Sequence, residues 1–186
     1  MLASCTNTIH PPEVPAESRV AYLVDLGRHT RLALSQPDGV FIEYAYGEWN
    51  WYATMQDQWW RAPAVLFWPT PGALGRQVWR PPGAEERLLQ HYSGLNVLRL
   101  PADERNVDAL TARLDRIYSE RSSDVVRNDV YGLDFVPHHR PYSMFNNSNH
   151  AVKRWLGELG YDVRGSGMFA EWELAHPDVA AAMRVQ

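Results

Sequence analysis

The sequence predicts one α+β domain in which an antiparallel sheet packs against helices. Segments rich in β-branched and aromatic residues dominate the first part of the 186-residue chain, and amphipathic helical segments follow them. The regular strand–helix–strand alternation that builds a parallel sheet is not present. We expect a single domain over residues 19–186, preceded by a flexible segment or tether over residues 1–18.

The strand patterns predict an antiparallel hairpin near the start of the domain. Residues 20–24 predict a first strand, which Gly27 interrupts and residues 29–34 continue, and residues 40–46 predict a second. Pro37-Asp38-Gly39 lies between the two and has the composition of a turn. A further strand is predicted over residues 95–100.

Helices are predicted where apolar residues recur at spacings of three and four. One runs from residue 107 to 118, with Asn106 as its cap, and a second begins near Ser148 and ends at Gly160. Shorter helices are predicted over residues 85–91 and 177–183.

Tryptophans are concentrated between residues 48 and 83, where prolines obscure the secondary structure apart from a short strand at 64–68. This cluster predicts packing over one edge of the sheet, and a ligand groove lined by aromatic rings is the alternative.

Composition and charge exclude several classes of function. The formal net charge is −4 and no stripe of Lys and Arg is present, which argues against a nucleic-acid partner. No apolar run is long enough to span a bilayer. His138, His139 and His150 lack the accompanying carboxylate or cysteine spacing of a metal site, so we expect neither a metal nor another cofactor.

Cys5 is the one cysteine, and its surroundings bear on the compartment. Residues 2–5, Leu-Ala-Ser-Cys, match a bacterial lipobox, in which the cysteine is lipidated, although the signal-peptide regions that normally precede it are absent. The proline-rich segment after Cys5 has the composition of a tether. A lipoprotein on the periplasmic side of the cell envelope is therefore one interpretation. A chance match in a cytoplasmic protein is the other.

Two segments could supply catalytic chemistry. Ser148 lies in an Asn-Asn-Ser-Asn-His run at a predicted helix start, where backbone N–H groups and the helix dipole stabilise negative charge. His29 lies in the early hairpin and could act as a base, with Glu43, or less favourably Tyr44, orienting its ring. The alternative is an ordinary helix cap at Ser148 and a hydrogen-bonded core histidine at position 29.

The same segments resemble a family of uncharacterised bacterial proteins first noted near urease genes. Residues 142–149, Tyr-Ser-Met-Phe-Asn-Asn-Ser-Asn, resemble that family's Tyr-Ser-Leu-Phe-Asn-Thr-Cys-Asn, and residues 43–48 resemble its Glu-Phe-Gly-Trp-Gly-Asp. Residues 66–71 resemble another shared stretch, and His29 stands in the place of the histidine of its His-Thr-Gly segment. The family in turn is similar to circularly permuted NlpC-type, papain-like proteins, which include lecithin:retinol acyltransferase. This resemblance implies that fold, with His29 as base and position 148 as nucleophile.

Two departures from the family pattern bear on function. Ser148 replaces the cysteine nucleophile, and Arg31 replaces the glycine after His-Thr, which places a bulky charge beside the expected site. A serine hydroxyl is far less acidic than a thiol and needs its proton removed during attack. We therefore expect a non-catalytic domain that binds a ligand or partner at the former active-site cleft.

The expected partner is a small molecule, a peptide or an envelope component. Tyr44, Asn146, Asn149 and Trp49 are the expected contact residues for it. The alternatives are an amide or ester hydrolase or acyltransferase that uses Ser148 and His29, and an envelope-tethered structural domain.

Overall fold

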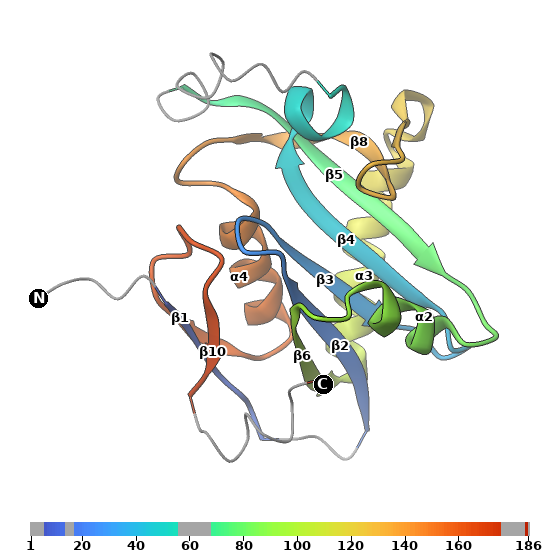
Figure 1. Cartoon of the computed structure of the whole chain (residues 1–186), viewed down its shortest axis with the longest axis vertical. Coiled ribbons are helices and arrows are strands. Elements are labelled where there is room, and N and C mark those ends of the chain that lie inside the picture. Colours follow the sequence, from blue (N-terminus) through green and yellow to red (C-terminus); the bar gives the residue numbers. More distant parts are fainter. Residues whose placement is uncertain (1–5, 14–16, 56–67, 176–184, 186) are drawn as a thin grey trace, which may run out of the picture.

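The structure, a computed structural model, describes residues 6–13, 17–55, 68–175 and 185. It has an α+β fold built on a large antiparallel sheet, with a small second sheet beside it (Figure 1). The predicted α+β class is confirmed. The strands are β1 (Asn7–His10), β2 (Ser18–Asp25), β3 (Thr30–Ser35), β4 (Phe41–Glu48), β5 (Thr70–Trp79), β6 (Asn96–Asp103), β7 (Val126–Asn128), β8 (Leu133–Tyr142), β9 (Asp162–Arg164) and β10 (Trp172–Leu174). The helices are the π-helix η1 (Trp49–Ala53), α2 (Ala84–His91), α3 (Glu104–Ser119), the 3-10 helix η3 (Ser122–Asp124) and α4 (Ser148–Glu158).

The large sheet has the strand order β6-β2-β3-β4-β5-β8-β7, and every neighbouring pair is antiparallel. The predicted hairpin is confirmed as β3 and β4, in which Ala33 pairs with Glu43. The expected continuation of the first strand past Gly27 is wrong, because the chain turns at Gly27 and β3 pairs antiparallel with β2. Because side chains alternate across a strand, residues 31, 33, 43 and 45 share one face of the sheet, and residues 32, 34, 44 and 46 share the other. The face on which a residue lies decides which helix it meets.

The two faces of the sheet are covered by different elements. Leu32, Leu34, Tyr44 and Tyr46 belong to the main core, to which α3 and α4 contribute their apolar stripes. On the opposite face, α2 packs over the β2–β3 side of the sheet, while η1 packs beside β5 and β8. In Figure 1, α2 lies in front of the sheet and α3 and α4 lie behind it.

Both long helices begin at polar caps. The sequence predicted Asn106 as the cap of the first, and this is wrong, because Asp103 accepts a hydrogen bond from the Arg105 backbone N–H and the helix begins at Glu104. Two acidic residues at the start of α3 suit the positive end of the helix dipole. The second helix, α4, begins at Ser148 as predicted, with Asn147 as its cap.

The small sheet joins the two ends of the chain. Its order is β10-β1-β9, with β1 parallel to β10 and antiparallel to β9. Thus Asn7–His10, which lies in the segment expected to be flexible, forms a strand whose Ile9 is fully buried in the main core. The physical reason is that residues 7–10 pair on both sides, so their backbone groups are satisfied within the fold.

Several predicted features lie outside the described residues. They are Cys5 with its lipobox match, the short strand at 64–68 except for its last residue, and the helix over 177–183. That last residue, Trp68, is described and does not lie in a strand. Among the described residues, no helix combines the length and the apolar character that crossing a membrane requires.

Candidate functional site

The start of α4 is held by a set of amide side chains. Asn147 Oδ1 accepts from the His150 backbone N–H at 3.0 Å, and its Nδ2 donates to the carbonyl oxygen of Met168 at 3.1 Å. Asn149 Nδ2 donates to that same carbonyl at 3.3 Å. Ser148 lies between these two amides and is 2% exposed, and its Oγ is 3.5 Å from Asn149 Oδ1. The hydroxyl therefore sits in a packed polar environment at the helix start.

The start of β3 lies directly against the start of α4. Thr30 Oγ1 donates to Asn149 Oδ1 at 2.8 Å and accepts from Trp172 Nε1 at 2.9 Å. Thr30 follows His29, and Asn149 follows Ser148, so the two sequence segments singled out for their chemistry contact each other. The contact runs through Thr30 and Asn149, both of which are almost completely buried.

His29 itself is 7% exposed and stacks on Tyr52 of η1, with ring centroids 4.7 Å apart. Its Nδ1 has no hydrogen-bond partner within the described part of the chain. Burial, together with the positive charge of Arg31, lowers the pKa of the His29 imidazole to about 3. A base with so low a pKa is neutral near pH 7 but accepts a proton only weakly, whereas an efficient general base has a pKa near the working pH.

Glu43, the expected orienting residue, is engaged elsewhere. Its Oε1 accepts from Arg31 at 3.0 Å and from the Tyr92 hydroxyl, and its Oε2 accepts from Trp79 Nε1 at 2.9 Å. Both oxygens are thus held by donors other than His29, and the carboxylate is fully buried. The structure brings Glu43 to Arg31 and does not bring it to the imidazole.

Arg31 completes this buried cluster rather than projecting into an open site. The guanidinium also donates to the Tyr92 hydroxyl at 2.7 Å and to the Tyr131 carbonyl oxygen at 3.1 Å. Desolvation opposes its charge, but Glu43 and Tyr92 outweigh that effect and raise the pKa of Arg31. Arg31 and Glu43 therefore form an ion pair on the sheet face that α2 covers.

The expected ligand-contacting residues are dispersed. Tyr44 lies on the α3 face of the sheet and donates to Asp115 at 2.7 Å. Trp49 packs in the η1 cluster, and Asn149 is committed to Thr30 and Met168. Asn146 donates to the Tyr46 hydroxyl at 3.1 Å. The structure therefore does not gather these side chains around one open cleft.

A cavity that the sequence did not indicate lies beside α4, where Tyr46, Arg140 and Arg154 are among the lining residues. In a sequence, arginines on a helix face look like ordinary solvated residues. The only sequence feature that could have indicated this cavity is the basic, histidine-rich run at residues 138–140. The wall of the cavity comes from four separate elements, β4, α3, β8 and α4, which only the fold brings together.

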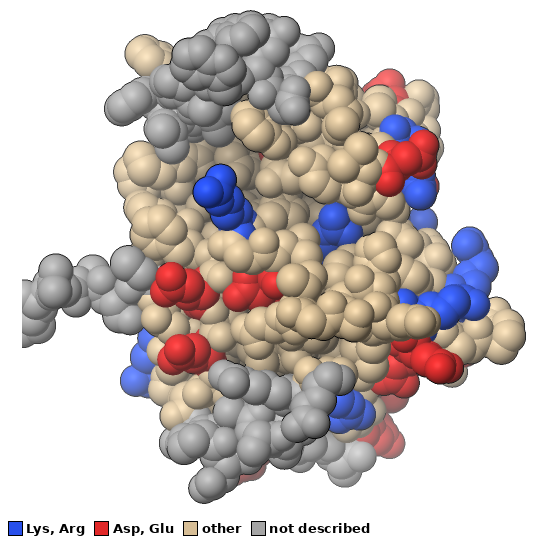
Figure 2. Space-filling model, viewed as in Figure 1, with Lys and Arg blue, Asp and Glu red and all other residues tan. Residues whose placement is uncertain are grey.

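The described residues offer little support for other ligand classes. No group of three or more His, Cys, Asp or Glu side chains among them is placed to hold a metal ion. On the face shown in Figure 2, charges of both signs are scattered over the described residues, and neither forms a continuous stripe. Comparison of the chain with protein-family models, with curated proteins and with solved structures found no match.

Proposed function

We propose that this chain is a papain-like domain of the circularly permuted NlpC type that has lost catalysis and acts by binding. The observation that supports the proposal best is the set of partners of Glu43. A nucleophile, a base and an orienting group must form a connected chain for acyl transfer. Here the orienting carboxylate is bound by Arg31, Tyr92 and Trp79, while His29 stacks on Tyr52.

The environment of Ser148 supports the same conclusion. The hydroxyl is 2% exposed, and the residues around the helix start are hydrogen-bonded to one another. A substrate carbonyl would have to displace these contacts before it reached Ser148. The expected base, His29, has a pKa of about 3 and would leave the hydroxyl protonated.

A fluorophosphonate probe tests this proposal, because it labels a serine only when a base activates it. We expect no labelling of the purified full-length protein under conditions in which a known serine hydrolase reacts completely. Labelling that disappears in both Ser148→Ala and His29→Ala would overturn the proposal and establish a serine-dependent acyl hydrolase. Labelling that survives both substitutions would identify another serine and would equally contradict it.

Restoring the sulfur gives a second readout. The Ser148→Cys variant should react with a thiol reagent no faster at pH 7 than a free thiol, whose pKa is about 8.5. His29 is neutral near pH 7 because burial lowers its pKa, so it adds no positive charge that would lower the pKa of the thiol, and burial at position 148 raises that pKa. The natural cysteine is replaced by Cys5→Ala both in this variant and in the control with Ser148, so that any measured reaction comes from the thiol at position 148. A thiol that titrates near neutral pH would show that the inherited base still operates.

A further inference from the structure

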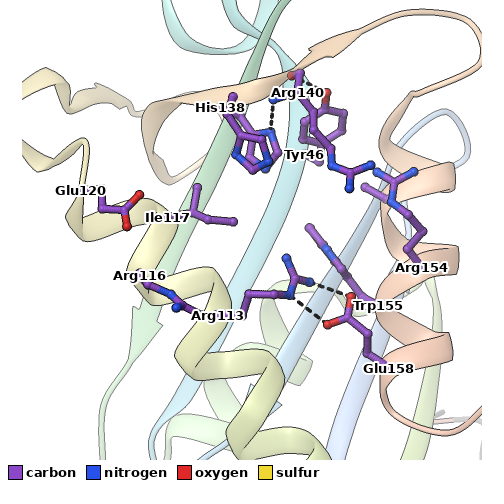
Figure 3. A pocket seen from close by; sticks show the side chains of 12 residues that line it. Tyr46, Arg113, Arg116, Ile117, Glu120, His138, Arg140, Arg154, Trp155 and Glu158 are labelled. Carbon is purple, nitrogen blue, oxygen red and sulfur yellow. Dashed lines mark hydrogen bonds and ion pairs between the residues drawn. The ribbon is translucent and has the colours of Figure 1, made fainter.

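A cavity of about 560 Å³ opens between α3, α4 and β8, away from the contact between Thr30 and Asn149 (Figure 3). Pockets that hold small molecules range from roughly 300 to 1,000 Å³. Four arginines and two glutamates line this one, so its wall is positively charged although the whole chain carries a net charge of −4. The cavity thus has the size of a ligand site and a charge opposite to that of the chain.

Two of these arginines converge without an acidic partner. Arg140 comes from β8 and Arg154 from α4, and Figure 3 shows their guanidinium groups side by side. Neither makes an ion pair within the described ranges of the chain. Desolvation and then the charge of Arg140 lower the pKa of Arg154. Two like charges held together in this way are stabilised when an anion lies between them.

The acidic residues of the wall do not fill that role. Glu158 is held by Arg113 through two hydrogen bonds of 2.8 and 2.9 Å. Glu120 lies across the cavity from the Arg140 and Arg154 guanidinium groups (Figure 3). The charge of Glu158 does act on Arg154, but neither Arg140 nor Arg154 forms an ion pair with a carboxylate of the described residues.

His138 adds a neutral donor to the same wall. Its Nδ1 accepts the Arg140 backbone N–H at 3.0 Å, and burial is the main cause that lowers its pKa to about 4. A neutral imidazole whose Nδ1 accepts must carry its hydrogen on Nε2. The His138 ring therefore carries its N–H group at Nε2. The backbone N–H of Arg140, one of the two arginines, fixes this tautomer.

Part of the remaining wall is apolar. Ile117 and Trp155 face the cavity from α3 and α4, and Ala151 lies one turn before Trp155. A ligand held by its charge at Arg140 and Arg154 would lay an apolar or ring-shaped portion against these side chains.

We propose that this cavity binds a small molecule that carries a phosphate group, with Arg140 and Arg154 holding the phosphate and Ile117 and Trp155 contacting the rest. One arginine already saturates both oxygens of a carboxylate in a bidentate pair. A phosphate monoester has three terminal oxygens and accepts from two guanidinium groups and a third donor at once. The site is independent of the chemistry at Ser148.

Phenyl phosphate is a suitable probe because it combines the charge with an apolar ring. Calorimetric titration of the full-length protein should show binding that is tighter than that of inorganic phosphate. Arg140→Gln and Arg154→Gln should each weaken it by about tenfold or more, since each loses a charge-assisted hydrogen bond. Arg105→Gln is the matched control, because that side chain is 86% exposed at the start of α3.

Each remaining outcome counts for or against the site. Absence of phenyl phosphate binding by the wild type, or equal binding by the two variants and the control, would overturn the proposal. Benzoate that binds as tightly as phenyl phosphate would overturn the assignment of phosphate. Binding to vesicles that contain phosphatidic acid, without binding of the soluble phosphates, would point to a lipid headgroup and contradict a small-molecule site.

Folding of the variants can be checked independently. Because Arg140 and Arg154 repel each other when no anion is bound, Arg154→Gln should unfold at the same temperature as the wild type or higher in phosphate-free buffer. It should then lose the rise in unfolding temperature that phenyl phosphate gives the wild type. A variant that is less stable without ligand would contradict the repulsion on which the argument depends.

Discussion

At the scale of single residues, Arg31 and Glu43 form a buried ion pair on the sheet face opposite α4. The Arg31 and Glu43 side chains are 5% and 0% exposed, and hydrogen bonds from Tyr92 and Trp79 satisfy the carboxylate further. Two charges leave water at a large cost, which is recovered only when both partners are present. The pair therefore belongs to the core.

This pairing gives a prediction about stability. Arg31→Met leaves Glu43 buried without its counter-charge, and we expect a loss of about 3–5 kcal/mol in the free energy of unfolding. The double variant Arg31→Met with Glu43→Leu should recover most of that loss, because no buried charge remains. Urea unfolding of the wild type, both single variants and the double variant measures the coupling. Additive single effects would show that the two side chains do not act as a pair.

At the scale of elements, β1 has the largest unexpected role. The composition of the first 18 residues is typical of a tether and does not predict a strand, since Asn7–His10 is short and lies between polar and proline-rich neighbours. Its stability comes from partners at the other end of the chain, β9 and β10. No local signal in the sequence carries that information.

Substitution of Ile9 tests the role of β1. The side chain is fully buried in the main core, so Ile9→Ala should lower the free energy of unfolding by about 2–5 kcal/mol. The exposed Glu13, a few residues later, provides the control, and Glu13→Ala should change it by less than about 0.5 kcal/mol. Thermal and urea unfolding would report both. An Ile9→Ala variant as stable as the control would mean that β1 is dispensable.

Elements with strong local patterns were predictable, and the candidate site was not. The stripe from Val107 to Tyr118 and the run after Ser148 predicted α3 and α4, and the β-branched and aromatic segments on either side of a Pro-Asp-Gly turn predicted the β3–β4 hairpin. The contact between the starts of β3 and α4 agrees with the expected neighbourhood. Glu43 binds Tyr92 and Trp79 because its side chain lies on the sheet face that these two residues also reach. That arrangement depends on the order of the strands in the whole sheet, which local residue spacing does not predict.

At the scale of the whole molecule, buried neutral histidines couple stability to pH. Desolvation lowers the pKa of His29 to about 3 and of His138 to about 4, and also lowers that of His150. Their ordinary value is 6.5, so the unfolded chain binds more protons than the folded one below that pH. The stability that these groups contribute is complete above pH 6.5 and is lost as the pH falls toward 4.

We therefore expect the urea midpoint to fall steadily between pH 7 and pH 5. His29→Phe preserves a ring against Tyr52 but removes one titrating group, so its midpoint should fall less steeply over the same range. Parallel curves for the variant and the wild type would show that His29 is protonated equally in both states, contrary to its burial.

The small sheet also bears on how the chain reaches its native state during synthesis. Asn7 donates a hydrogen bond to the carbonyl oxygen of Phe169, a residue 162 positions later, and both strand partners of β1 belong to the last part of the chain. At ribosomal rates of about 5–20 residues per second, those partners emerge roughly 8 to 30 seconds after β1 does. The strand β1 is therefore without its two strand partners throughout that interval, and the small sheet can form only after β9 and β10 have been synthesised.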